Sequence, residues 1–246
     1  MGWNEIQFVI LAFISELLGT LSGFGSSTFF MPLAQIFENY HLVLVLTSAL
    51  HVFGNLNRMI QFASKVELKS ILLFVLPSML FSFLGALLNP YVPLSILEKI
   101  LAVFLLAISV YQLFFKSGTR SKAEPSAAPI ALPIFLIALS GFLTGLIGTG
   151  GAIRGAALMS LGLPQNLFIH LSSLIDIAGD VLRLGAYLYN GYMDWSHWFY
   201  LPLLALAAFT GTWIAKKILA RIPKERFYKI VSFFILISSI VLFFKT

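Results

Sequence analysis

The chain of 246 residues contains no cysteine and few charged residues. Without cysteine, disulfide bonds, thiolate metal ligands and thiol nucleophiles are all excluded, and cysteine usage says nothing about the redox compartment. Charged residues make up 11% of the chain and hydrophobic residues 59%, against roughly 25% and 45–50% in soluble domains. A soluble fold cannot bury that much apolar surface, so the composition predicts an integral membrane protein.

Two long runs, 71–88 and 233–244, contain no charged residue. The first is about long enough to cross ~30 Å of hydrocarbon at ~1.5 Å per residue. The N-terminal segment has no Lys or Arg before Arg58 and carries Glu5 and Glu16. It therefore lacks the basic region of a cleaved signal peptide, and we expect it to form the first helix of an all-α membrane protein.

The chain is organised as two similar halves. A polar, low-complexity stretch at 116–129, KSGTRSKAEPSAAP, is typical of a flexible linker. Shifting the sequence by 125 positions aligns identical or related residues on either side of it: Gly23 with Gly148, Gly25 with Gly150, Ser48 with Ser173, His51 with Asp176, Gly54 with Gly179, Asn55 with Asp180, Arg58 with Arg183 and Pro77 with Pro202. Polar residues are rare in membrane spans, so this pattern indicates a duplicated unit, with repeats at 1–115 and 130–246.

Each half is predicted to contain a glycine-broken apolar segment followed by three uninterrupted helices. The expected ranges are 3–37, 41–62, 68–88 and 94–115 in the first half, and 130–161, 165–189, 195–215 and 225–244 in the second. The breaks fall at 23–25 and 148–151. Only about 12 residues follow each break, which is ~18 Å of helix and too short to span. A re-entrant loop or a full hairpin is therefore expected.

The positive charges distinguish two topologies. If each broken segment enters and leaves on one side, the Lys- and Arg-rich loops at 64–69, 116–128 and 216–226 share one face, and the loops at 89–93 and 190–196, without Lys or Arg, share the other. If each broken segment crossed once, the most basic loop would lie outside. The first topology is favoured. It places the basic loops and the linker in the cytoplasm, in a multi-pass protein of the cell (inner or plasma) membrane.

The two halves are then inverted, as in many secondary transporters whose interrupted helices form a site near the bilayer midplane.

The glycine breaks are the first candidate for a binding site. A short helix after each break would present free N–H groups and the positive end of its dipole to the membrane centre, and such ends bind anions. We therefore expect the backbone of five residues to contact an anion: Gly25, Ser26, Ser27, Gly150 and Gly151. In the alternative reading, these glycines only permit close helix packing.

A polar stripe follows each break at helical steps of three or four: Ser48, His51, Asn55 and Arg58, then Ser173, Asp176, Asp180 and Arg183. His51 and Asn55 are candidates for substrate contact. Arg58 and Arg183 are expected toward opposite membrane faces, where they would gate the site or attract the anion, unless they only snorkel to the interface.

The remaining buried charges have separate predicted roles. Arg154 lies about one turn past the second break and is the expected direct ligand, because its planar fork of donors suits sulfonate, sulfite or carboxylate. Asp176 and Asp180 cannot reach water and, with His51, are candidates for coupling to a proton or a cation. Glu16 either binds a coupling proton or pairs with an arginine.

No pattern indicates an enzyme, a metal site or a cofactor. His41, His170 and His197 lack a second ligand at metal-binding spacing, and no order of Ser, His and Asp suggests a hydrolase. The net charge of +6 lies mostly in loops, which indicates a basic cytoplasmic face and not nucleic-acid binding. The expected partners are a small anion, a coupling proton or sodium ion, and lipid; monomer and homodimer remain equally open.

Two glycine-rich segments, SGFGSSTFFMPLAQIF at 22–37 and TGLIGTGGAIRGAALMSLGLP at 144–164, together with the duplicated layout, resemble the sulfite exporter TauE/SafE family of membrane permeases. Pro32 and the loop at 162–164 also fit, whereas Ser26 and Ser27 replace the more usual glycines. The resemblance implies transport, often export, of a sulfur-containing oxyanion or organosulfonate such as sulfite or sulfoacetate. The alternatives are an anion channel with the same cavity and a transporter of a non-sulfur organic anion.

Overall fold

The structure is a computed structural model that describes residues 3–23, 25–114 and 130–219. The predicted linker at 116–129 and the last expected helix at 225–244 lie outside these residues. Within them the chain is helical and contains no strand, which confirms the all-α prediction. Four helices are long and apolar enough to cross a membrane: Trp3–Ser22, Tyr40–Gln61, Leu68–Tyr91 and Trp195–Leu219.

The helices follow the predicted order in both halves. The first half contains α1 (Trp3–Ser22), α2 (Ser27–Ala34), α3 (Tyr40–Gln61), α4 (Leu68–Ser70), the π-helical η1 (Ile71–Val75), α5 (Leu76–Leu88), the 3₁₀ turn η2 (Asn89–Tyr91) and α6 (Leu94–Phe114). The second half contains α7 (Ala131–Ile147), α8 (Gly151–Met159), α9 (Gln165–Tyr189), the 3₁₀ turn η3 (Trp195–His197) and α10 (Tyr200–Leu219). The predicted helix at 195–215 thus begins with a 3₁₀ turn and continues to Leu219.

Both broken segments reverse direction at their glycines. Gly23 and Gly25 adopt φ angles of 73° and 84°, and Gly148 adopts 80°, a left-handed conformation that only glycine takes up without strain. Phe8 in α1 contacts Phe30 in α2, with ring centroids 5.1 Å apart, and also Phe37 beyond it, at 6.4 Å. The chain therefore returns along α1 after the break, so the segment is a hairpin with one short arm.

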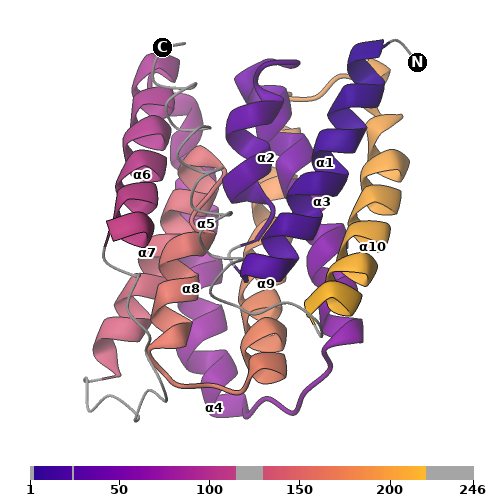
Figure 1. Cartoon of the computed structure of the whole chain (residues 1–246). Helices are drawn as coiled ribbons and strands as arrows, with labels where there is room; N and C mark the ends of the chain where they lie inside the picture. Colours follow the sequence, from indigo (N-terminus) through magenta and orange to yellow (C-terminus); the bar gives the residue numbers. More distant parts are fainter. Residues whose placement is uncertain (1–2, 24, 115–129, 220–246) are drawn as a thin grey trace.

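The packing of the helices repeats between the halves (Figure 1). Helix α1 packs against α10, and α7, its counterpart, packs against α5, the counterpart of α10. In the same way α3 packs on α10 while α9 packs on α5, and α3 and α9 contact each other at the centre. Helices that match at the offset of 125 positions thus have corresponding neighbours.

Helices α3 and α9 run in opposite directions. His41, at the start of α3, stacks near Tyr192, just past the end of α9, with ring centroids 4.3 Å apart. Further along α3, Asn55 donates a hydrogen bond to Asp180 of α9 at 2.8 Å. These two contacts make α3 and α9 antiparallel.

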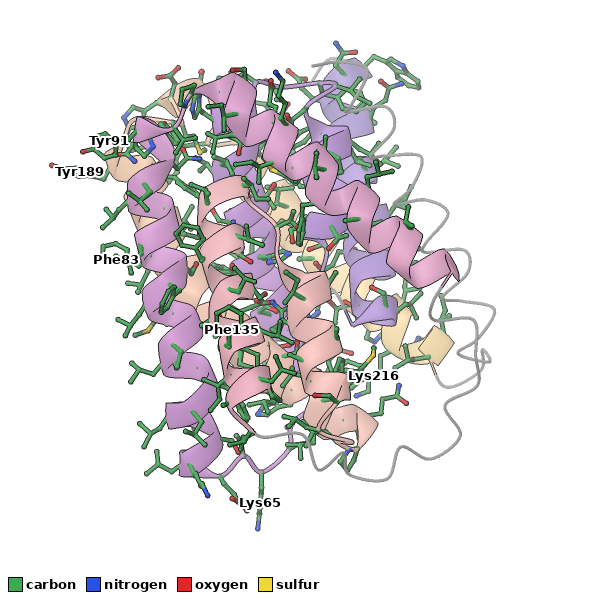
Figure 2. The ribbon with its side chains drawn as sticks, turned by 90° about the vertical axis from the view of Figure 1, so that its left-hand side faces the viewer. Lys65, Phe83, Tyr91, Phe135, Tyr189 and Lys216 are labelled. Carbon is green, nitrogen blue, oxygen red and sulfur yellow. The ribbon has the colours of Figure 1, made fainter. Side chains whose placement is uncertain are left out.

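The two ends of the bundle differ in charge. Figure 2 shows Lys65 and Lys216 at one end and Tyr91 and Tyr189 at the other. Lys216 donates to the carbonyl of Gln61 at 2.7 Å, so the ends of α3 and α10 adjoin. The described parts of the loops at 64–69 and 216–226 therefore share one end of the molecule.

The bundle is apolar outside and polar inside. Large apolar side chains on its outer surface are exposed, among them Leu84, Phe135 and Phe209. In contrast, Glu16, Asp180 and other charged groups are buried in the interior. This distribution suits a protein surrounded by hydrocarbon, in which polar groups must find partners inside the bundle.

Candidate functional site

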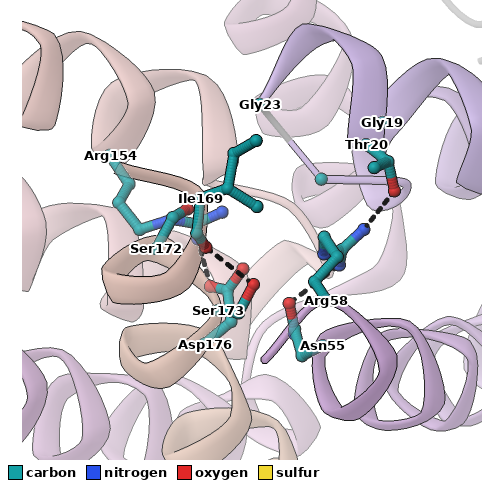
Figure 3. A pocket seen from close by; sticks show the side chains of 11 residues that line it. Gly19, Thr20, Gly23, Asn55, Arg58, Arg154, Ile169, Ser172, Ser173 and Asp176 are labelled. Carbon is teal, nitrogen blue, oxygen red and sulfur yellow. Dashed lines mark hydrogen bonds and ion pairs between the residues drawn. The ribbon is translucent and has the colours of Figure 1, made fainter. Parts of the chain in front are cut away.

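A narrow pocket lies between the two halves, where the first break meets α3, α8 and α9 (Figure 3). Its lining residues are Gly19, Thr20, Gly23, Gly25, Asn55, Arg58, Arg154, Ile169, Ser172, Ser173 and Asp176. The free space at its centre is about 10 Å³, about what one water molecule needs. A larger ligand therefore requires the lining residues to move apart.

Arg154 reaches from α8 across the pocket to α9. Its Nε donates to the Ser172 hydroxyl at 2.9 Å, and its Nη1 bonds the Asp176 carboxylate. Its Nη2 points toward the first break, 3.6 Å from where a Cβ on Gly25 would lie. The guanidinium of the predicted direct ligand thus faces the break of the opposite half, because the two breaks lie side by side at the centre of the bundle.

The guanidinium of Arg58 donates hydrogen bonds to three residues of the first half. Its Nη1 donates to Glu16 at 2.5 Å and to Thr20 at 2.9 Å, and its Nη2 donates to Asn55 at 2.7 Å. Glu16 also accepts a hydrogen bond from Thr212 at 2.9 Å. Of the two roles considered for Glu16, the structure shows the ion pair with an arginine.

Arg183 is completely buried beside Asp180. Its Nε donates to Asp180 Oδ1 at 2.8 Å, and its Nη1 donates to the Thr144 carbonyl at 3.4 Å. Asp180 Oδ2 accepts from Asn55 at 2.8 Å, and Asn55 in turn accepts from Arg58. A continuous chain of hydrogen bonds therefore joins the two counterpart arginines.

The burial of these arginines excludes the alternative reading, in which they snorkel to an interface. Arg58 is 4% exposed and Arg183 is 0% exposed, so neither snorkels to an interface. Each arginine has a carboxylate partner inside the bundle, and pairing there removes the reason for a long side chain to reach water.

His51 links α3 to the start of α2. Its Nε2 accepts a hydrogen bond from the backbone N–H of Ser27 at 2.8 Å, and its Nδ1 lies 3.4 Å from Asp180 Oδ2. Because Nε2 is an acceptor, it carries no proton, and the imidazole is neutral with its proton on Nδ1; this tautomer is assigned from the hydrogen bond. One of the backbone donors predicted for anion binding is thus engaged by His51.

The two breaks touch each other. The Ser27 hydroxyl donates to Thr149 at 3.3 Å, and the Ser140 hydroxyl donates to the Gly150 carbonyl at 2.8 Å. Of the predicted backbone ligands, Gly25 lines the pocket. The other four are not among its lining residues: Ser26, Ser27, Gly150 and Gly151.

Four pocket residues were not predicted: Gly19, Thr20, Ile169 and Ser172. Thr20 follows Glu16 by four residues, and Ser172 precedes Asp176 by four, so helical spacing alone could have identified them. Ile169 carries no polar group, and no signal in the sequence marks it.

The buried charges of the described residues balance. There are three buried ion pairs: Glu16 with Arg58, Asp176 with Arg154, and Asp180 with Arg183. His51, Asp176 and Asp180 bring three potential cation ligands within 4.8 Å of one another. Both carboxylates already pair with arginines, which would repel a metal ion, so this cluster does not make a metal site. The arrangement is better suited to an anion, which can share donors with the carboxylates.

Comparison with known proteins agrees with this geometry. Residues 8–242 match the sulfite exporter TauE/SafE family. A probable membrane transporter protein of Methanocaldococcus jannaschii is 29% identical over 208 residues, which cover 76% of each chain. The match and the apolar helices make this chain a multi-pass membrane transporter and not an enzyme. It belongs to the sulfite exporter TauE/SafE family.

Proposed function

We propose that the protein is a secondary transporter that exports a small sulfur-containing oxyanion or organosulfonate, such as sulfite or sulfoacetate. The observation that carries this proposal is the pocket between the halves, which is lined by the guanidinium groups of Arg58 and Arg154. Two planar forks of donors in a buried site match the oxygens of a sulfite or sulfonate group. The family to which the chain belongs supports a sulfur anion as the substrate.

Arg154 is the proposed direct ligand. Nε and Nη1 are engaged with α9, whereas Nη2 faces the pocket wall at Gly25. Asp176 then keeps the Arg154 guanidinium in place between transport cycles. The arriving anion binds the same guanidinium alongside Asp176. Arg58 attracts the anion from the other wall while it stays paired with Glu16.

Alternating access follows from the proposed inverted arrangement of the halves. The pocket is lined by Arg58, near the end of α3, and by Ile169, near the start of α9. Both positions lie in the part of the bundle nearer Lys65 and Lys216, and we propose that this end is cytoplasmic. Export then requires α3 and α9 to shift along each other, which rearranges the hydrogen bonds between Asn55 and Asp180.

The test is thermal unfolding of the purified protein in detergent against sulfite, thiosulfate, sulfate, sulfoacetate, taurine, acetate and chloride. An anion that binds only the folded protein stabilises it by about 2.7 kcal/mol at about 100 times its Kd. We expect a selective shift with one sulfur anion. A shift with acetate alone would show a non-sulfur organic anion, and no shift with any anion would contradict the proposal.

Transport in vesicles separates a carrier from a channel. A carrier saturates with substrate and accelerates the exchange of labelled anion when unlabelled anion is present on the other side. We expect both properties. Flux that rises linearly with concentration and shows no exchange would establish an anion channel.

A further inference from the structure

His51 holds the backbone N–H of the first turn of α2 through an unprotonated nitrogen. The Ser27 N–H donates to its Nε2 at 2.8 Å, and the ring is 1% exposed. If Nε2 gains a proton, it becomes a donor and this hydrogen bond is lost. The Ser27 N–H and the new Nε2–H would then be two donors facing each other, an arrangement that needs an acceptor between them.

The space beside Gly25 brings these donors together with Arg154. A Cβ on Gly25 would lie 3.2 Å from His51 Cε1, 3.4 Å from His51 Nε2 and 3.6 Å from Arg154 Nη2. Because glycine has no side chain, the imidazole of His51 lies directly behind Gly25, which lines the pocket together with Arg154. An anion oxygen placed there would meet Arg154, protonated His51 and the freed N–H of α2.

The charge balance also requires a proton. The six charged groups around His51 form three pairs: Asp176 with Arg154, Asp180 with Arg183, and Glu16 with Arg58. With neutral His51 their charges cancel, so an added anion leaves one buried negative charge unbalanced, which is costly. One proton taken up with each monovalent anion restores the balance.

Among the described titratable groups of the cluster, His51 can change its charge without breaking an ion pair. In the empty pocket, protonation of Asp176, Asp180 or Glu16 would leave a buried arginine without its counter-charge, at a large cost. His51 holds no arginine within the described residues; its neighbours are the Ser27 N–H and Asp180 Oδ2, which lies 3.4 Å from Nδ1.

We propose that His51 takes up one proton together with the anion, so that the protein is an anion–proton symporter and His51 is its proton site. The inference rests on the proposed function, since it concerns the same pocket. The net charge moved is then one unit more positive than that of the anion. A monovalent anion moves without net charge, and its flux is independent of the membrane potential.

The first experiment counts protons. Sulfoacetate keeps both of its negative charges between about pH 6 and about pH 8, so a proton taken up on binding goes to the protein, where His51 can offset one of the two charges. We expect wild-type protein in weakly buffered detergent to take up about one proton per bound sulfoacetate. Above the pKa of the free proton site, Kd should rise by up to tenfold per pH unit. Binding without proton uptake would overturn the symport inference and leave the proposed function standing, whereas absence of sulfoacetate binding at every pH would count against the proposed function itself.

The second experiment locates the proton. In His51→Gln the amide oxygen can accept the Ser27 N–H, but the side chain cannot gain a charge. We expect this variant to bind sulfoacetate more weakly than wild type, with an affinity that does not change with pH, and without proton uptake. His197→Gln, in the turn before α10, is the matched control and should retain both properties.

Proton uptake that persists in His51→Gln would place the proton on a carboxylate and overturn the assignment of His51. If His51→Gln does not fold, His51→Asn makes the same test with a shorter amide. The wild-type proton count needs no variant, and a count of zero overturns the inference by itself.

Discussion

The ion pair between Arg154 and Asp176 allows the roles of charge in stability and in binding to be separated. Both side chains are almost completely buried. Arg154→Gln removes the guanidinium and leaves the Asp176 carboxylate without its partner in the interior. Removing one member of a buried pair costs about 3–5 kcal/mol. For a chain of this size, about 2–4 °C per kcal/mol converts that loss to roughly 6–20 °C in Tm.

A double variant removes the unpaired charge. In Arg154→Gln with Asp176→Asn, two neutral amides replace the ion pair and can still bond each other and Ser172. No buried charge is left without a partner, so we expect most of the lost stability to return. The measurement is thermal unfolding of wild type, both single variants and the double variant in detergent without added anion.

Anion binding should follow a different pattern. Arg154 is the proposed ligand, and a hydrogen bond to a charged group contributes about 1.5–3 kcal/mol, so its loss should weaken binding about 10- to 150-fold. The double variant is expected to be stable and yet to bind the sulfur anion weakly. If it binds with wild-type affinity, Arg154 serves only the packing of α8 on α9, and the binding argument is refuted.

Two further predictions concern groups around the same pocket. Gly25→Ala places a side chain at φ 84° and against His51, so we expect it to cost about 1–3 kcal/mol of stability and to weaken anion binding, as measured by unfolding with and without anion. Gly185→Ala is its control, because a Cβ there meets nothing within 4 Å and a helical Ala should stabilise by about 0.5–1 kcal/mol. Glu16→Gln leaves Arg58 without its counter-charge, so the variant should lose about 3–5 kcal/mol in the absence of anions and show a larger anion-induced shift than wild type. An equal or smaller shift would contradict the place of Arg58 at the anion site.

The helices and their breaks could be predicted because their signals are local. Hydropathy marks the spans, and the paired glycines mark the reversals, where positive φ angles are required at Gly25 and Gly148. Polar residues at matching positions predict a duplication because such residues are unusual inside apolar segments. An antiparallel contact of α3 with α9 is one feature that two inverted halves would have.

The partners of the arginines on other helices could not be predicted from these signals. Glu16 and Arg58 are separated by 42 residues along the chain, and no spacing rule connects them. Thr212, which also bonds Glu16, comes from the other half. In contrast, Asp180 and Arg183 are three residues apart on one helix, so this pair could have been identified from its spacing. Charge pairing between helices depends on packing, which hydropathy and periodicity do not report.

The two halves contribute different residues to the site. Asn55 and Asp180 are counterparts in the repeat, and they bond each other where α3 meets α9. The residues that make the pocket chemistry are not shared: Arg154 aligns with Phe29, a buried apolar residue, and His51 aligns with Asp176. One half therefore contributes an imidazole, and the other contributes a carboxylate held by an arginine. If the two halves contributed equivalent residues, the site would offer two positions for a proton and two arginine ligands for an anion. Since they differ, the protein should bind one anion and one proton per cycle.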